Sequence, residues 1–313
     1  MDQTGQRLAG QRVLVTGASG FIGRTLMTAL ATAGARPIGL GRHPAAPHMP
    51  AGIAWVCADL VSDPLDAVLA DSKADAIVHC AALTAAPDTD RGRADLFAAN
   101  LTATIRLIDA AAQMPQSVRL VVVSSAAIWA PMPPELATID EDFAMRPVAA
   151  YGVSKAAATL YALAQSDRLG LDLAVAVPFN VIGPGQPRRL VPQVFIDQLR
   201  TDPARLTLDN PSAVRDWVDV RDVAVALVSL CQPKAPRGLF NIASGEGHSL
   251  QDMLWALCRV GGWSPLVQTG VPHTETGVSR SIGNPQRLRA ATRWTRQIAL
   301  ETSLADMILA STA

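Results

Sequence analysis

The chain has 313 residues, of which 49% are hydrophobic and 17% charged, so it can bury a large core and is not mainly disordered. Its 27 basic and 27 acidic residues cancel, which argues against nucleic acid or an anionic membrane as a partner. The polar residues 1–11 lack the apolar core of a signal peptide, and no stretch of 18 consecutive apolar residues follows. We therefore expect a soluble, cytoplasmic protein.

Short runs rich in valine and isoleucine alternate with alanine- and leucine-rich segments as far as Pro178. The longer segments place apolar residues at spacings of three and four, which predicts helices at Gly23–Ala33, Asp95–Gln113 and Ser154–Leu169. Repeated strand–helix–strand units predict an α/β fold with a Rossmann-type, doubly wound parallel sheet. The predicted strands are Arg12–Thr16, Pro37–Leu40, Ile53–Cys57, Ala76–Cys80, Val118–Ser124 and Leu173–Pro178.

The pattern changes after Pro178, where prolines and glycines interrupt the chain as far as Pro211. A helical pattern returns at Asp219–Leu230 and a strand-like one at Leu239–Ala243, so we expect the chain to rejoin the first sheet there. The predicted dinucleotide-binding domain therefore comprises residues 1–178 plus 214–244. A smaller, mainly C-terminal substrate lobe comprises residues 179–213 plus 245–313.

A glycine-rich turn follows the first predicted strand directly and leads into the first helix. Glycine allows the backbone to turn sharply beside a pyrophosphate, and the helix N-terminus offers N–H groups to the anion. The alternative is an ordinary tight turn. The residues expected to contact the dinucleotide are Gly17, Ser19, Gly20, Phe21, Ile22 and Gly23.

The end of the second strand reads Gly39-Leu40-Gly41-Arg42-His43 and carries no carboxylate for the adenosine ribose of NAD. Arg42 can instead pair with a 2′-phosphate, so the sequence favours NADP over NAD. The alternative is that Arg42 is a solvated loop residue.

The chain has only two tyrosines, and Tyr151 stands four residues before Lys155. On a helix this spacing puts both side chains on one face, where an ammonium would lower the pKa of the phenol and let it exchange a proton during hydride transfer. Ser124 and Ser125 end the fifth strand, where one hydroxyl can hold a carbonyl oxygen. The alternatives are a surface pair on an amphipathic helix and a serine-capped strand end.

The four cysteines are far apart, which predicts buried free thiols rather than a disulfide framework. The five histidines show no metal-ligand spacing, so we predict no metal site. His79 lies in a buried strand pattern and is interpreted as a hydrogen-bonded core residue rather than a base.

Together with these features, a series of short motifs resembles the extended short-chain dehydrogenases/reductases, the NAD-dependent epimerase/dehydratase type. The resemblance spans nearly the whole chain. The motifs are Thr16–Gly23, Ala58-Asp59-Leu60, Val78-His79-Cys80-Ala81-Ala82, Asn100, Val123–Trp129, Tyr151–Lys155, Pro178–Gln186, Arg215–Val220, Asn241–Gly245 and Trp294.

This resemblance implies that Ser125, Tyr151 and Lys155 are the catalytic triad. It also implies two sets of binding positions and a homodimer formed through Asp95–Gln113 and Ser154–Leu169. The expected further cofactor positions are Arg42, Asp59, Leu60, Cys80, Ala81, Ala82, Asn100, Ser124, Tyr151, Lys155, Pro178 and Phe179. The expected substrate positions are Thr84, Ser125, Trp129, Asn180, Arg215 and Arg280.

Pro178–Gln186 is most similar to GDP-4-keto-6-deoxymannose reductases, so we expect NADP-dependent reduction of the keto group of a nucleotide-linked 4-keto-6-deoxy sugar. The alternatives are a nucleotide-sugar 4-epimerase with bound NAD, reduction of a non-sugar carbonyl, and a non-catalytic dinucleotide sensor. Ala126 and Ala127 replace the acidic pair of the family's dehydratases, and Arg280 is the only arginine in the late block His273–Arg280.

Overall fold

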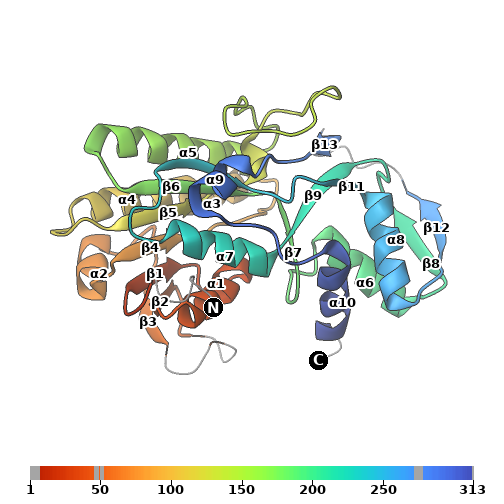
Figure 1. Cartoon of the computed structure of the whole chain (residues 1–313), viewed down its shortest axis with the longest axis horizontal. Helices are drawn as coiled ribbons and strands as arrows, with labels where there is room; N and C mark the ends of the chain where they lie inside the picture. The colour runs from red at the N-terminus through yellow and green to blue at the C-terminus, as the bar shows by residue number, and fades with distance from the viewer. Residues whose placement is uncertain (1–7, 46–48, 50–52, 271–277, 312–313) are drawn as a thin grey trace.

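In the residues that the computed structural model describes, namely 8–45, 49, 53–270 and 278–311, seven strands form one parallel sheet (Figure 1). The chain crosses over between neighbouring strands, and helices cover both faces, as a doubly wound sheet requires. This arrangement confirms the predicted fold class. In spatial order the strands are β10 (Gly238–Ile242), β6 (Leu173–Pro178), β5 (Arg119–Val123), β4 (Ala76–His79), β1 (Arg12–Thr16), β2 (Arg36–Gly41) and β3 (Ala54–Cys57).

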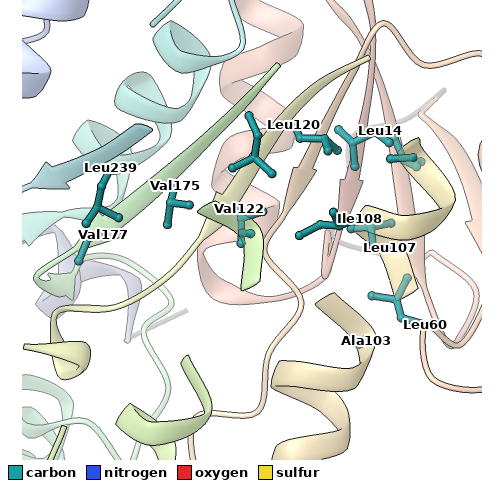
Figure 2. Close-up of a cluster of buried hydrophobic side chains, with 14 of the residues drawn as sticks. Leu14, Leu60, Ala103, Leu107, Ile108, Leu120, Val122, Val175, Val177 and Leu239 are labelled. Atoms are coloured by element: carbon teal, nitrogen blue, oxygen red, sulfur yellow. The ribbon is translucent and has the colours of Figure 1, made fainter. Parts of the chain in front are cut away.

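Two hydrophobic clusters lie on opposite faces of this sheet because side chains alternate along each strand. Leu120 and Val122 of β5 join one cluster, whereas Val121 and Val123 join the other. Figure 2 shows part of the first cluster, including Leu120 and Val122 of β5 and Leu107 and Ile108 of a covering helix. The helices that bury residues in the first cluster are α2 (Leu65–Ser72), α4 (Ala103–Ala112) and α5 (Ala150–Leu169), and those in the second are α1 (Phe21–Thr32), α7 (Val220–Leu230) and α9 (Gln286–Thr292).

A second group of elements packs around a third hydrophobic cluster, beyond the carboxyl ends of the large sheet in Figure 1. Its sheet pairs β9 (Val214–Asp219) with β7 (Asn180–Ile182), β11 (Gly247–Ser249) and β13 (Arg280–Ser281). The other members are α6 (Val191–Thr201), α8 (Leu250–Gly261), α10 (Leu300–Ala310) and the parallel pair β8 (Arg205–Leu208) and β12 (Leu266–Thr269). The division into two lobes at the predicted boundaries remains a prediction.

The expected helix at Asp95–Gln113 differs from the observed one, which begins earlier and is not uniform. It comprises α3 (Asp90–Phe97), the π-helical turn η1 (Ala98–Thr102) and α4. The Thr89 hydroxyl accepts a hydrogen bond from the Gly92 N–H at 3.0 Å, and this N-cap sets the earlier start. Likewise, α5 begins at Ala150 rather than Ser154, so Tyr151 lies in its first turn.

The carboxylate of Asp216 ties the small sheet to the exit of β10 from the large one. It is fully buried and accepts hydrogen bonds from the Ser244 N–H (2.8 Å), the Ser244 hydroxyl (2.7 Å), the Gly245 N–H (2.9 Å) and the Gly283 N–H (3.2 Å). Burial raises the pKa of this carboxyl, and the four hydrogen bonds oppose the rise. Asp216 therefore fixes the junction between the two sheets.

Replacing Asp216 with Ala should lower the free energy of unfolding by about 3 kcal/mol, because buried N–H groups would lose their acceptor. Urea denaturation followed by circular dichroism measures this change. Asp71→Ala, which removes an exposed carboxylate, is the control and should shift stability by less than about 0.5 kcal/mol. Equal effects of the two substitutions would contradict the role given to Asp216.

Candidate active site

The glycine-rich turn presses directly against the loop that follows β4. Gly17 has φ +65°, and a Cβ on it would lie 2.7 Å from the Ala81 nitrogen. Its N–H donates to the Leu40 carbonyl at 3.0 Å, which joins the turn to β2. Only glycine can adopt this backbone conformation and also fit so close to Ala81. The turn can therefore place a ligand in contact with main-chain atoms.

Helix α1 begins directly after Gly20, and no side chain caps its N-terminus. Ser19 and Gly20 are exposed, Phe21 and Ile22 are half-buried, and Gly23 is buried in the helix. An uncapped helix N-terminus leaves main-chain N–H groups available for an anion. The turn and the helix start together fit the pyrophosphate of a dinucleotide.

Arg42 lies just beyond β2, with its side chain exposed. On the neighbouring strand-end loop, Asp59 accepts a hydrogen bond from the Val61 N–H at 2.8 Å, while Leu60 is buried in the first hydrophobic cluster. The Asp59 carboxylate therefore shapes its own loop.

Asn100 ties the loop after β4 to the helix that carries Tyr151. Its amide oxygen accepts from the Leu83 N–H at 2.8 Å, and its amide nitrogen donates to the Leu83 carbonyl (2.8 Å) and the Ser154 hydroxyl (2.9 Å). Ser154 in turn donates to the Tyr151 carbonyl at 2.8 Å. Asn100 stands in the π-helical turn η1, and turns of this kind occur frequently at functional sites.

His79 extends this network to the glycine-rich turn. The Thr104 hydroxyl donates to the Asn100 carbonyl at 2.7 Å, so its oxygen must accept from His79 Nε2 at 2.9 Å. His79 Nδ1 then accepts from the Thr16 hydroxyl at 2.7 Å. Burial, aided by the charge of Lys155, lowers the pKa of His79 to about 3, so the ring is neutral. This confirms the interpretation of His79 as a hydrogen-bonded core residue.

The structure brings Ser125 and Tyr151 together. The Ser125 hydroxyl lies close enough to the Tyr151 phenol to lower the pKa of the phenol, and it accepts a hydrogen bond from the Ala127 N–H at 3.2 Å at the start of η2 (Ala126–Ile128). A Cβ on Gly152 would lie 2.3 Å from the Ala127 carbonyl oxygen, so glycine allows α5 to approach this turn. The two hydroxyls thus form a pair that can hold one carbonyl oxygen.

Lys155 is buried on α5, one turn after Tyr151, and its ammonium donates to the Val123 carbonyl at 2.6 Å. Burial lowers the pKa of Lys155 to about 8. The pKa of Tyr151 is raised by burial, and the nearby Ser125 hydroxyl opposes the rise. The expected lowering of the Tyr151 pKa by Lys155 is therefore not found in the structure, where burial raises this pKa and the Lys155 ammonium donates to the Val123 carbonyl.

Several predicted contact residues have buried side chains. The Ser124 hydroxyl bonds the Thr159 hydroxyl at 2.7 Å, and Trp129 and Phe179 belong to the first hydrophobic cluster. Pro178 ends β6 and is also buried. By contrast, Ala82 is exposed, and Cys80 and Ala81 are half-buried. Cys80, Ala81 and Ala82, in the loop after β4, are therefore more accessible than the other residues of this set.

The predicted substrate positions Asn180, Arg215 and Arg280 lie on three strands of the small sheet. Asn180 donates to the Asp216 carbonyl at 3.3 Å, while Arg215 donates to the carbonyls of Val214 and Val278, each at 2.9 Å. Burial lowers the pKa of Arg215. Within the described residues, neither arginine pairs with a carboxylate, and the buried Nε of Arg280 has no partner. The neighbouring segment His273–Gly277 lies outside the described residues.

Arg24 and Arg189 were not predicted, although both contact site loops. Arg24, one residue after Gly23, donates to the Gly185 carbonyl, and its guanidinium carbon lies 5.8 Å from the centroid of the Phe21 ring. Arg189 donates to the Thr84 hydroxyl. Both arginines thus hold the loop after β7: Arg24 connects it to α1, and Arg189 connects it to the loop after β4. Their only sequence signals are the position of Arg24 beside the glycine turn and the pair Arg188–Arg189.

Residues 13–243 match the sequence model of the NAD dependent epimerase/dehydratase family. The chain belongs to this family. It is 28% identical over 302 residues, 94% of this chain and 95% of the relative, to GDP-6-deoxy-D-mannose reductase of Pseudomonas aeruginosa. It is 31% identical over 278 residues, 86% and 85% of the two chains, to dTDP-6-deoxy-L-talose 4-dehydrogenase (NAD(P)(+)) of Kitasatospora kifunensis. Among solved structures it is similar to UDP-glucose 4-epimerase of Thermus thermophilus in complex with NAD, with TM-score 0.86, 26% identity and coverage of 97% and 99%.

Family membership makes this chain an NAD(P)-dependent enzyme of the extended short-chain dehydrogenase/reductase type. In the described residues no helix is long and apolar enough to cross a membrane, and no cluster of histidine, cysteine, aspartate or glutamate could hold a metal. All four cysteines are free, but Cys57 at the end of edge strand β3 is exposed, so the expectation that every thiol is buried was wrong.

Acid should destabilise the protein through His79. Its pKa is 6.5 without the fold and about 3 when folded, so between these values the unfolded chain binds a proton that the folded chain does not. This contribution to stability is present above pH 6.5 and is lost as the pH falls toward 3, with up to a tenfold rise in the unfolding equilibrium constant per pH unit. Urea midpoints from pH 7 to 4 should fall less steeply for His79→Gln. Parallel slopes would contradict the prediction.

Proposed function

We propose that the protein uses NADPH to reduce the keto group of a nucleotide-linked 4-keto-6-deoxy sugar. The contact between the Ser125 hydroxyl and the Tyr151 phenol, one helical turn from buried Lys155, is the observation that carries the proposal. A carbonyl oxygen placed between these hydroxyls would receive two hydrogen bonds at the atom where negative charge develops.

In this proposal Tyr151 donates the proton to the carbonyl oxygen, and Ser125 keeps that oxygen hydrogen-bonded. Bound NADPH would supply the hydride. Desolvation keeps Tyr151 protonated, which suits a proton donor. The Lys155 ammonium lies on the same face of α5 and would stabilise the phenolate that remains after proton transfer.

The preference for NADP rests on Arg42. No carboxylate occupies the end of β2, and the exposed guanidinium can pair with a 2′-phosphate. The start of α1, which no side chain caps, is proposed to bind the pyrophosphate, and the Asp59–Leu60 loop to contact adenine. The Cys80–Ala82 loop and Asn100 are proposed to line the cofactor site.

A nucleotide diphosphate substrate is supported by the cationic small sheet. Arg280 pairs in register with Val214, and Arg215 pairs with Ser281, so both arginines belong to the same pair of strands, and both bind main-chain carbonyls rather than carboxylates. A diphosphate would supply the missing negative charge. Thr84, Asn180 and Trp129 complete the proposed substrate positions. Dehydration is not proposed, because Ala126 and Ala127 of η2 offer no acid or base.

A 4-epimerase with retained NAD is the second candidate, favoured by the structural similarity to the UDP-glucose 4-epimerase of Thermus thermophilus. It would use Ser125, Tyr151 and Lys155 in the same places. The two functions differ in outcome, because a reductase consumes reduced cofactor and an epimerase does not. The absence of a carboxylate at the end of β2 supports the reductase.

Replacing Tyr151 with Phe should reduce turnover of NADPH with nucleotide 4-keto-6-deoxy sugars by roughly 10²–10⁴-fold, because the proton donor is lost. NADPH binding, measured by calorimetry, should change by less than about threefold, since the phenol is not a phosphate contact. Tyr161→Phe, the other tyrosine of α5, is the matched control.

Unchanged turnover in Tyr151→Phe would overturn the proposed chemistry and leave a dinucleotide sensor. If the wild type arrives with tightly bound NAD and interconverts sugars without net oxidation of NADPH, the reductase proposal fails and the epimerase replaces it. Turnover confined to simple ketones would point to a non-sugar carbonyl.

We further propose a homodimer through α4 and α5, where Val153 and Leu160 leave apolar side chains exposed on α5. Val153→Glu with Leu160→Glu should convert a dimer to a monomer in analytical ultracentrifugation, because charge would be desolvated at the contact. A monomeric wild type would contradict this proposal.

A further inference from the structure

Trp55 of edge strand β3 lies flat across two glycines of β2. The register pairs Trp55 with Gly39, and a Cβ on Gly39 would lie 2.4 Å from the indole ring. A Cβ on Gly41 would lie 2.9 Å from the same ring. The two glycines therefore make room for the indole on one face of the sheet.

That face is the one on which the dinucleotide turn lies. A Cβ on Gly39 would also meet the Ala18 side chain at 3.2 Å, and Trp55 packs against the hydrophobic cluster that α1 covers. The indole is thus placed beside the end of β2, next to the segment proposed to recognise the 2′-phosphate.

The indole N–H of Trp55 is hydrogen-bonded to the segment that contains Arg42. Trp55 Nε1 donates to the His43 carbonyl at 2.8 Å, and the Gly41 carbonyl accepts from the Ala58 N–H at 3.1 Å. Both residues that flank Arg42 are therefore hydrogen-bonded to β3 or the residue that follows it. The Arg42 side chain itself remains exposed.

We propose that Trp55 is a positioning residue for cofactor choice: its indole N–H fixes the segment that presents Arg42 to the 2′-phosphate of NADPH. This inference rests on the proposed NADP preference. Fixing the backbone on both sides of a charged residue reduces the ordering that a ligand must impose when it binds. NADH lacks the 2′-phosphate and gains nothing from this arrangement.

Trp55→Phe keeps a ring over Gly39 and Gly41 but removes the N–H. The dissociation constant of NADPH, measured by calorimetry, should rise about 3–10-fold, as expected for one lost hydrogen bond. The dissociation constant of NADH should change by less than about twofold. Trp263→Phe, the same substitution in the third hydrophobic cluster, is the matched control and should leave both values unchanged.

A double-substitution cycle tests whether Trp55 acts through Arg42. Arg42→Ser should weaken NADPH binding by about tenfold or more, because a charge-assisted contact is lost. In the Arg42→Ser background, Trp55→Phe should have no further effect on NADPH. Unfolding midpoints in urea verify that each variant is folded.

The outcomes separate this inference from the proposed function. If the wild type prefers NADPH but Trp55→Phe keeps the full preference, or weakens NADPH and NADH equally, the positioning role is overturned and the NADPH reductase stands. Additive effects in the cycle would also overturn it. A wild type that binds NADH as tightly as NADPH overturns the cofactor assignment and the inference together.

Discussion

One buried chain of hydrogen bonds joins the proposed cofactor and proton-donor halves of the site. It runs from the Thr16 hydroxyl through His79 and Thr104 to the Asn100 carbonyl, and from the Asn100 amide through Ser154 to the carbonyl of Tyr151. The donor and acceptor roles of each hydroxyl and of the imidazole are fixed by its neighbours, so the network has a single consistent arrangement of protons. A glycine turn and a tyrosine far apart in sequence are thereby held in one rigid frame.

Burial determines which groups in and around this network carry a charge. His79 remains neutral because a charge there would be desolvated and would face the Lys155 ammonium. Lys155 is itself buried with a carbonyl as its hydrogen-bond partner, and the half-buried Arg215 donates to the carbonyls of Val214 and Val278. Buried cations without carboxylate partners are costly, and an anionic ligand reduces that cost. The site is therefore electrostatically suited to phosphate-bearing molecules.

The junction of the two sheets determines how the proposed substrate residues are placed relative to Tyr151. Asp216 joins β9 to the chain leaving β10, so the strands that carry Asn180, Arg215 and Arg280 are attached to the large sheet, against which the Tyr151 helix α5 packs. Arg24 and Arg189 add contacts from the loop after β7 to α1 and to Thr84. Substrate recognition and proton transfer can then depend on a common geometry, although the residues come from separate segments of the chain.

Local signals in the sequence were sufficient for the parallel sheet, the glycine turn and the helical spacing of Tyr151 and Lys155, because strand periodicity, turn chemistry and helix geometry act over a few residues. They placed the start of α5 too late and missed the π-helical turn at Asn100, since these depend on packing against other elements. The raised pKa of Tyr151, the Thr16 and Thr104 partners of His79, the four hydrogen bonds to the Asp216 carboxylate and the indole contact beside Arg42 were decided by tertiary structure alone. Each depends on desolvation or on a partner distant in sequence, and neither quantity is expressed in any local pattern of residues.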